Sequence, residues 1–126
     1  MQNFRNLAVW KKAHDLVLAT YAATNGFPRE ELYGLRLQLR TSATSIGMNI
    51  AEGCGRSGDK DFARFLHFSM GSANELEYQI LLARDLRFIS IRVHSELECR
   101  TTEIKKMLAS LLRKLRAESC ELKARS

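Results

Sequence analysis

Apolar residues recur every three or four positions along most of the chain, which is the spacing of residues on one face of an α-helix. Near the middle, Leu35, Leu39, Ile46 and Ile50 follow this spacing, and a cluster of glycines comes after them. Several glycines close together end a helix, so a helix is predicted to stop near Gly53. The complete pattern predicts four helices, over approximately residues 6–25, 29–53, 59–88 and 94–117. Residues 118–126 are predicted to form a frayed tail.

Two details of the packing follow from the positions of apolar and small residues. The first helix is expected to bury a face that consists of Leu7, Trp10, His14, Val17, Leu18 and Tyr21. A glycine inside a helix costs about 1 kcal/mol relative to alanine, so Gly71 in the third helix implies a close contact between helices. Gly47 in the second helix is equally small, and we expect these two glycines to lie against each other.

Polar residues lie on or beside the apolar faces of the second and third helices. A buried polar group without a hydrogen-bond partner costs about 1–3 kcal/mol, so these side chains are expected to pair inside the protein or between subunits. Converging carboxylates and hydroxyls are also found in active sites, but in an oligomeric bundle such a cluster more often fixes the register of the helices. We predict a structural cluster, and no catalytic residue, with the members Ser42, Ser45, Asn49, Glu52, Glu75 and Glu77.

The composition agrees with a small helical protein. The chain has 126 residues, of which 45% are hydrophobic, and this suits one core but not two domains. Pro28 is the only proline, and the later segments are rich in leucine, alanine, lysine, arginine and glutamate, which favour helices. We predict one all-α domain over residues 1–126, folded as an up-down-up-down four-helix bundle. The apolar stripes of the second and fourth helices are wider than one core needs, which favours self-association.

Positive charge is concentrated near the end of the chain. The net charge is +6, and the segment from Lys105 to the last residue contains seven basic and two acidic residues, a net charge of +5. Such a strip is compatible with a phosphate backbone or an acidic partner, but a solvated last helix has the same composition. With the arginines of the second helix and the following loop, the candidates for nucleic-acid contacts are Arg36, Arg40, Arg56, Lys105, Lys106, Arg113 and Lys114.

No motif in the sequence points to a metal ion, a cofactor or a nucleotide. The three cysteines, Cys54, Cys99 and Cys120, are far apart and odd in number, which argues against a disulfide framework and a zinc site. Residues 53–58 read G-C-G-R-S-G and lack the G-K-[ST] ending of a phosphate-binding loop. The E-x-x-H motif that recurs in di-metal bundles does not occur. We therefore expect a protein that is not an enzyme.

The sequence contains no segment typical of secretion or membrane insertion. Residues 1–12 contain no apolar run of signal-peptide length, and no stretch of about 18 apolar residues occurs anywhere. We expect a cytoplasmic protein that has no membrane partner.

Five segments, in order, cover most of the first ninety or so residues and carry a resemblance: F-R-N-L-A-V-W-K-K-A-H-D-L (4–16), G-F-P-R-E-E-L-Y-G-L-R-L-Q-L-R (26–40), S-I-G-M-N-I-A-E-G-C-G-R (45–56), F-A-R-F-L (62–66) and G-S-A-N-E-L-E (71–77). They resemble the 23S rRNA intervening-sequence proteins, a family of four-helix-bundle proteins. The chain departs from the family pattern at Thr41 and Ser57, where relatives carry arginine, and at Gly47, where they carry proline. The basic edge of the second helix is reduced accordingly.

The resemblance implies a ring-like homo-oligomer of four-helix bundles, a pentamer. A distant relative, the accessory protein of diversity-generating retroelements, binds nucleic acid and a reverse transcriptase. Two functions are compatible with the family and with the basic surface. The first is non-enzymatic binding of structured RNA or DNA. The second is a protein-interaction scaffold that docks on a polymerase or a ribosome-associated partner without touching nucleic acid.

Overall fold

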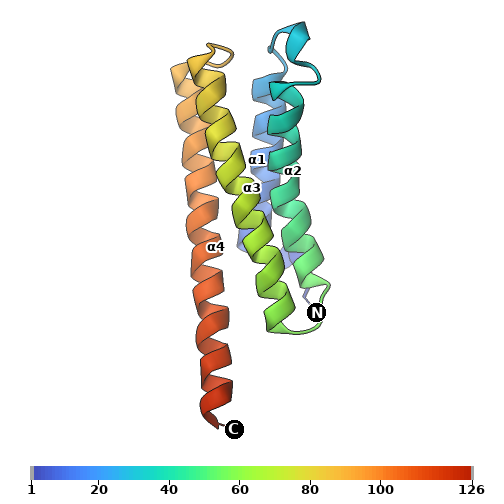
Figure 1. The fold of residues 1–126 in the computed structure, drawn as a ribbon, viewed down its shortest axis with the longest axis vertical. Helices are drawn as coiled ribbons and strands as arrows, with labels where there is room; N and C mark the ends of the chain where they lie inside the picture. The colour runs from blue at the N-terminus through green and yellow to red at the C-terminus, as the bar shows by residue number, and fades with distance from the viewer. Residues whose placement is uncertain (1, 126) are drawn as a thin grey trace.

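The computed structural model describes residues 2–125, which form four antiparallel α-helices and contain no β-strand. Each helix packs against the next one along the chain, and the last also packs against the first, as in an up-down-up-down bundle (Figure 1). This confirms the predicted all-α four-helix fold. The bounds of the helices are α1 Ala8–Thr24, α2 Leu35–Cys54, α3 Asp59–Asp85 and α4 Ile91–Arg125, with short 3-10 helices η1 Phe4–Asn6 and η2 Arg29–Glu31.

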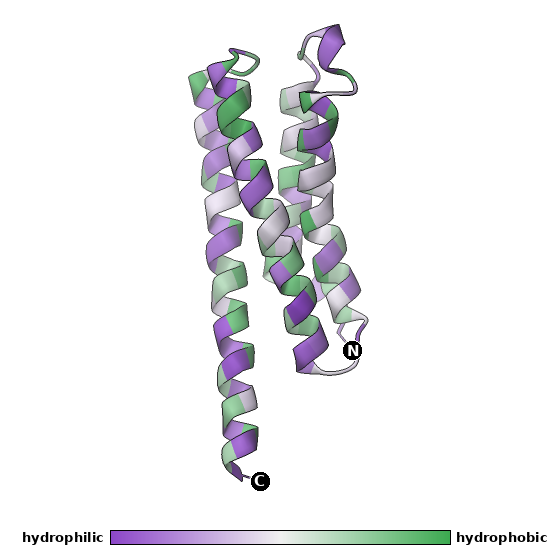
Figure 2. Cartoon of the chain, viewed as in Figure 1, coloured by the Kyte–Doolittle hydropathy of each residue, from purple (hydrophilic) through white to green (hydrophobic). Residues whose placement is uncertain are grey.

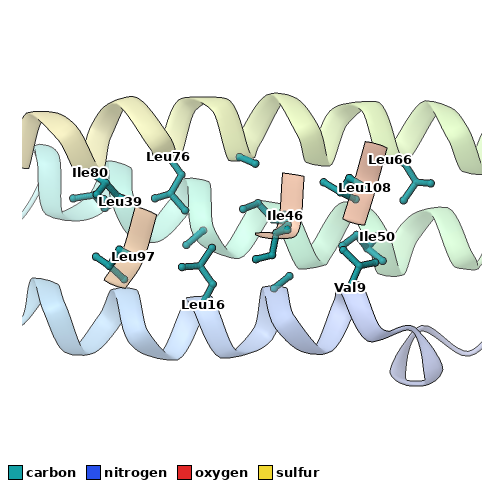
Figure 3. Packing of buried hydrophobic residues seen from close by; sticks show 14 of the residues in the cluster. Val9, Leu16, Leu39, Ile46, Ile50, Leu66, Leu76, Ile80, Leu97 and Leu108 are labelled. Carbon is teal, nitrogen blue, oxygen red and sulfur yellow. The ribbon is translucent and has the colours of Figure 1, made fainter. Parts of the chain in front are cut away.

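One hydrophobic core runs along the middle of the bundle. Leu16 of α1, Ile46 of α2, Leu76 of α3 and Leu108 of α4 are all completely buried. Figure 3 shows these and neighbouring side chains pointing toward one another from the surrounding helices. Full burial of a leucine or isoleucine contributes roughly 1.5–3 kcal/mol, so the fold depends mainly on this core.

The buried face of α1 differs from the predicted one. Leu18 and Tyr21, which the sequence pattern assigns to the core, are 58% and 42% exposed. Thr20 and Thr24 are buried instead, and each hydroxyl donates a hydrogen bond of 2.8 Å to the carbonyl oxygen four residues earlier. Because the helix itself satisfies these hydroxyls, threonine can occupy the core, and a search for apolar residues alone gives the wrong face.

The ends of two helices also differ from the prediction. α2 begins at Leu35 and not near residue 29, because Arg29–Glu31 form a 3-10 turn and the Glu31 carboxylate accepts the Leu35 N–H at 2.9 Å. α4 continues to Arg125, so the predicted frayed tail from residue 118 is helical over the described residues. Alanine, glutamate, leucine, lysine and arginine predominate there, and all of them favour helix. α4 therefore extends beyond the other three helices (Figure 1).

α2 and α3 approach each other through a serine, and not through the predicted pair of glycines. Ser69 is buried, and its Oγ donates to the carbonyl oxygen of Ile46 at 2.8 Å. Gly47 faces the Trp10 ring of α1, at 3.6 Å from Nε1 to the position of an added Cβ. A Cβ at Gly71 would meet nothing within 4 Å. The expected contact between Gly47 and Gly71 is therefore wrong.

Gly53, near the end of α2, lies where α3 leaves no room for a side chain. A Cβ there would lie 2.9 Å from Phe62 Cδ1 and 3.0 Å from Phe65 Cβ. We expect Gly53→Ala to lower the free energy of unfolding by about 1–3 kcal/mol, because the neighbouring rings would have to move. Gly71→Ala, at an exposed position of α3, should raise it by about 0.5–1 kcal/mol. Urea unfolding of both variants measures the difference, and equal stabilities would contradict this packing.

Candidate nucleic-acid interface

A groove with a volume of about 730 Å³ lies between the first half of α3 and the second half of α4. We call it the α3–α4 groove. It lies at the end of the bundle where α4 runs past the start of α3 (Figure 1). Among the described residues that line it, Asp59 alone is acidic, and the basic ones are Lys60, His67, Arg113, Arg116 and Lys123.

Helical spacing explains why this groove is basic. Arg113, Arg116 and Lys123 are three and seven positions apart, so they share one face of α4. Glu118 and Glu121 each lie two positions from one of these cations, which is about 200° around the helix. The acidic residues of this segment therefore project away from the groove.

The floor of the α3–α4 groove is apolar, unlike its rim. Leu112 and Leu115 are each 8% exposed and belong to the core. Ala63, Met70 and Ala109 line the groove beside them and are half-buried. Hydrophobic and hydrophilic residues accordingly alternate along the second half of α4 in Figure 2. A ligand in the groove would meet hydrocarbon below it and positive charge at its sides.

Three cations of the rim are free to bind a ligand. Lys60, Arg113 and Arg116 are exposed, and none of them forms an ion pair within residues 2–125. Sequence reasoning selected only Arg113 of this set. The 3-and-7 spacing along α4 is a signal for Arg116 and Lys123, but Lys60 and His67 belong to another helix and become part of the site only through the fold.

The other predicted candidates on α4 lie outside the groove. Lys106 and Lys114 are exposed on other parts of the helix surface. Lys105 is half-buried, and its Nζ lies 3.3 Å from the Glu77 carboxylate of α3. This ion pair joins α3 to α4 and leaves Lys105 less available to a phosphate.

Arg40, a predicted nucleic-acid contact, holds α2 to the end of α1. Its guanidinium donates to Thr24 Oγ1 at 2.8 Å and to Asn25 Oδ1 at 3.1 Å. It also donates to the carbonyl oxygen of Tyr21 at 3.3 Å and lies 4.3 Å from the centre of that ring. With these partners Arg40 has a structural role in the bundle.

The remaining two arginine candidates differ in their contacts. Arg56 forms an ion pair of 2.7 Å with Glu52, and its guanidinium lies 4.9 Å from the centre of the Phe65 ring. Arg36 is half-buried, and its Nε has no hydrogen-bond partner among the described residues. The three arginines of this region do not share a groove with the cations of α4.

The predicted polar cluster divides into separate interactions. Ser45 Oγ lies 2.8 Å from Ser72 Oγ, and Asn49 Nδ2 donates to the backbone oxygen of Ser45 at 2.9 Å and to its Oγ at 3.0 Å. Ser42 is buried in α2, and Glu75 is exposed on α3. The other two carboxylates belong to the ion pairs described above. Only Ser45 and Asn49 are therefore brought together, and with Ser72 they link α2 to α3.

The solvent side of α2 forms a second, shallower groove of about 880 Å³. Leu37, Thr41, Thr44 and Met48 follow each other along it at steps of four, three and four. Leu37 is 48% exposed and Met48 is 65% exposed. These four residues, which we call the α2 outer face, carry no charge, although the solvent side of a helix is normally polar and charged.

The described residues also define what chemistry is available elsewhere. No group of three or more histidine, cysteine, aspartate or glutamate residues in the range 2–125 could hold a metal ion. The three cysteines are free, and burial raises the pKa of the Cys54 thiol, which keeps it protonated and a weak nucleophile. Within the same range, the helices are too short or too polar to cross a lipid bilayer.

Comparison with known proteins gives two matches that agree with each other. The model of the 23S rRNA-intervening sequence protein family matches residues 5–110. A crystal structure of a protein with unknown function, from the S23 ribosomal protein family of Bacteroides thetaiotaomicron, superposes with a TM-score of 0.77. The two chains are 26% identical, and the match covers 83% of this chain and 95% of the other. None of the curated proteins compared with the chain matches it.

Proposed function

The chain belongs to the 23S rRNA-intervening sequence protein family, and on this premise we propose that it is a non-enzymatic, self-associating bundle that binds structured RNA or DNA through the α3–α4 groove. The observation that carries the proposal is the convergence of Lys60, Arg113, Arg116 and Lys123 on one groove. Lysine and arginine bind phosphates of any sequence, so the affinity comes from the backbone of the nucleic acid and not from base recognition.

The polar side chains of the bundle support a binding role rather than catalysis. A general acid or base has to reach the proton that it transfers. Glu52 and Glu77 are each paired with a cation of their own chain, and Asn49 donates to Ser45. The Glu77 ion pair joins α3 to α4, and the Glu52 and Asn49 contacts stay within α2 and the turn that follows it.

The α2 outer face supports self-association. A stripe of uncharged residues at steps of three and four is the pattern by which one helix packs against another. Within one chain this stripe faces solvent, where Leu37 and Met48 expose apolar surface. A second copy covers it in our proposal, and a closed ring such as the pentamer that the family resemblance implies would bury one such face on every subunit.

Affinity for RNA should fall steeply as salt is added. With three or four phosphate contacts, log K should change with log salt concentration with a slope of about −2 to −3, which is roughly 20- to 50-fold between about 50 and 200 mM salt. Fluorescence anisotropy of a labelled RNA at several salt concentrations measures this slope. If neither RNA nor DNA binds at the lowest salt concentration, the proposed function is ruled out.

The exposed α2 outer face also favours the second function, a scaffold that docks on a polymerase or ribosome-associated protein without nucleic-acid contact. The two functions predict different material in the purified protein. Bound nucleic acid raises the absorbance at the nucleic-acid maximum relative to that at the protein maximum. Nuclease treatment then lowers this ratio. A scaffold would instead be free of nucleic acid and would retain one specific polypeptide.

A further inference from the structure

We propose that the α3–α4 groove takes a single-stranded segment, such as a loop, bulge or end, in preference to a regular duplex. The inference rests on the proposed function and names the form of nucleic acid that this site accepts. It follows from two features of the groove: the apolar floor and the line of cations at the rim.

Among forms of nucleic acid, only one with exposed bases can use the apolar floor. In a duplex the bases are stacked inside and the surface consists largely of sugars and phosphates, so Met70, Leu112 and Leu115 would remain uncovered. The unstacked bases of a single strand can lie on apolar surface and stack on histidine rings or guanidinium planes. His67, Arg113 and Arg116 line the same groove and carry such planar groups.

The size of the groove also suits a single strand. The volume of about 730 Å³ is that of a pocket for a small organic molecule, so it can admit a few bases of a flexible strand.

The cations of the rim follow the length of the groove. At a rise of 1.5 Å per residue, Arg116 lies about 4.5 Å along α4 from Arg113, and Lys123 lies about 10 Å further. Lys60 faces them from the start of α3. A strand that runs along the groove can thus place successive phosphates near successive cations while its bases point to the floor.

Fluorescence anisotropy with two probes tests the inference: a labelled single-stranded oligouridine and a labelled RNA hairpin duplex with the same number of phosphates. We expect the single strand to bind about tenfold more tightly than the duplex at the same salt concentration. His67→Ala should remove most of this preference because it removes a stacking surface, and His67→Phe should keep it. Lys114→Ala, an exposed change on α4 outside the groove, should leave the preference unaltered.

The other outcomes each exclude something specific. Equal affinity for both probes, or equal weakening of both by His67→Ala, would overturn the preference for single strands and leave the proposed function standing. No binding of either probe would overturn both. An acidic amphipathic helix could also use the apolar floor and basic rim, so a peptide of that kind is the third probe. If this peptide binds and neither oligonucleotide does, the groove is a site for a protein partner and not for nucleic acid.

Discussion

RNA binding should weaken about 100-fold or more when Arg113 and Arg116 are both changed to glutamate. A hydrogen bond to a charged group contributes about 1.5–3 kcal/mol, and a factor of ten in affinity corresponds to about 1.4 kcal/mol. Loss of two such contacts therefore removes at least two orders of magnitude. The salt slope should also become less steep, by about 1.4 for a single strand, because two fewer counterions are displaced. Anisotropy titrations at several salt concentrations measure both quantities.

A matched double variant separates the groove from general electrostatics. Lys106→Glu with Lys114→Glu changes the net charge by the same amount on the same helix, but outside the groove. We expect a loss of less than about tenfold from this control, since charges at a distance are screened by salt. Circular dichroism should show that both double variants keep their helices. Equal losses of affinity in the two would contradict a specific role for the α3–α4 groove.

Met48→Glu should dissociate the oligomer into single chains. Met48 is 65% exposed on one chain and is the last residue of the uncharged α2 outer face. If a second copy covers this face, a carboxylate there must be buried without a partner, which costs several kcal/mol and corresponds to a loss of association of about 100-fold or more. Light scattering coupled to size-exclusion chromatography gives the mass in solution directly.

Ile91→Glu is the control for that experiment. Ile91 is 79% exposed at the start of α4, outside the α2 outer face, so the same change of residue type should leave the mass unaltered. Both variants should keep their helices, as circular dichroism can show. A wild-type chain that is already monomeric, or a Met48→Glu variant with the wild-type mass, would exclude this face as the interface.

The fold follows from features that act within one helix. Periodic apolar residues identify α2, α3 and α4, and the glycines from Gly53 to Gly58 mark the end of α2. Two of the errors have a common physical origin, since each depends on a hydrogen bond that periodicity does not contain. Thr20 and Thr24 enter the core because their hydroxyls bond to the helix backbone, and Glu31 delays the start of α2 by capping Leu35.

The candidate site was harder to predict because it combines two helices. The concentration of charge near the end of the chain is visible in the sequence, and Arg113 is part of the groove. A count of charges cannot tell which cations are engaged: Arg40 is bound by residues of the α1 end, and Lys105 by Glu77. Nor can it pair Lys60 with α4, because that proximity exists only after α3 and α4 have packed together.

The most direct test of the account is photochemical crosslinking of a single-stranded RNA that contains 4-thiouridine, followed by mass spectrometry of the crosslinked peptides. Crosslinking reports where the bases lie, and not only whether RNA binds. We predict crosslinks within residues 60–70 of α3 and 109–123 of α4. Crosslinks concentrated within residues 32–52, on the solvent side of α2, would contradict the assignment of the α3–α4 groove as the nucleic-acid interface.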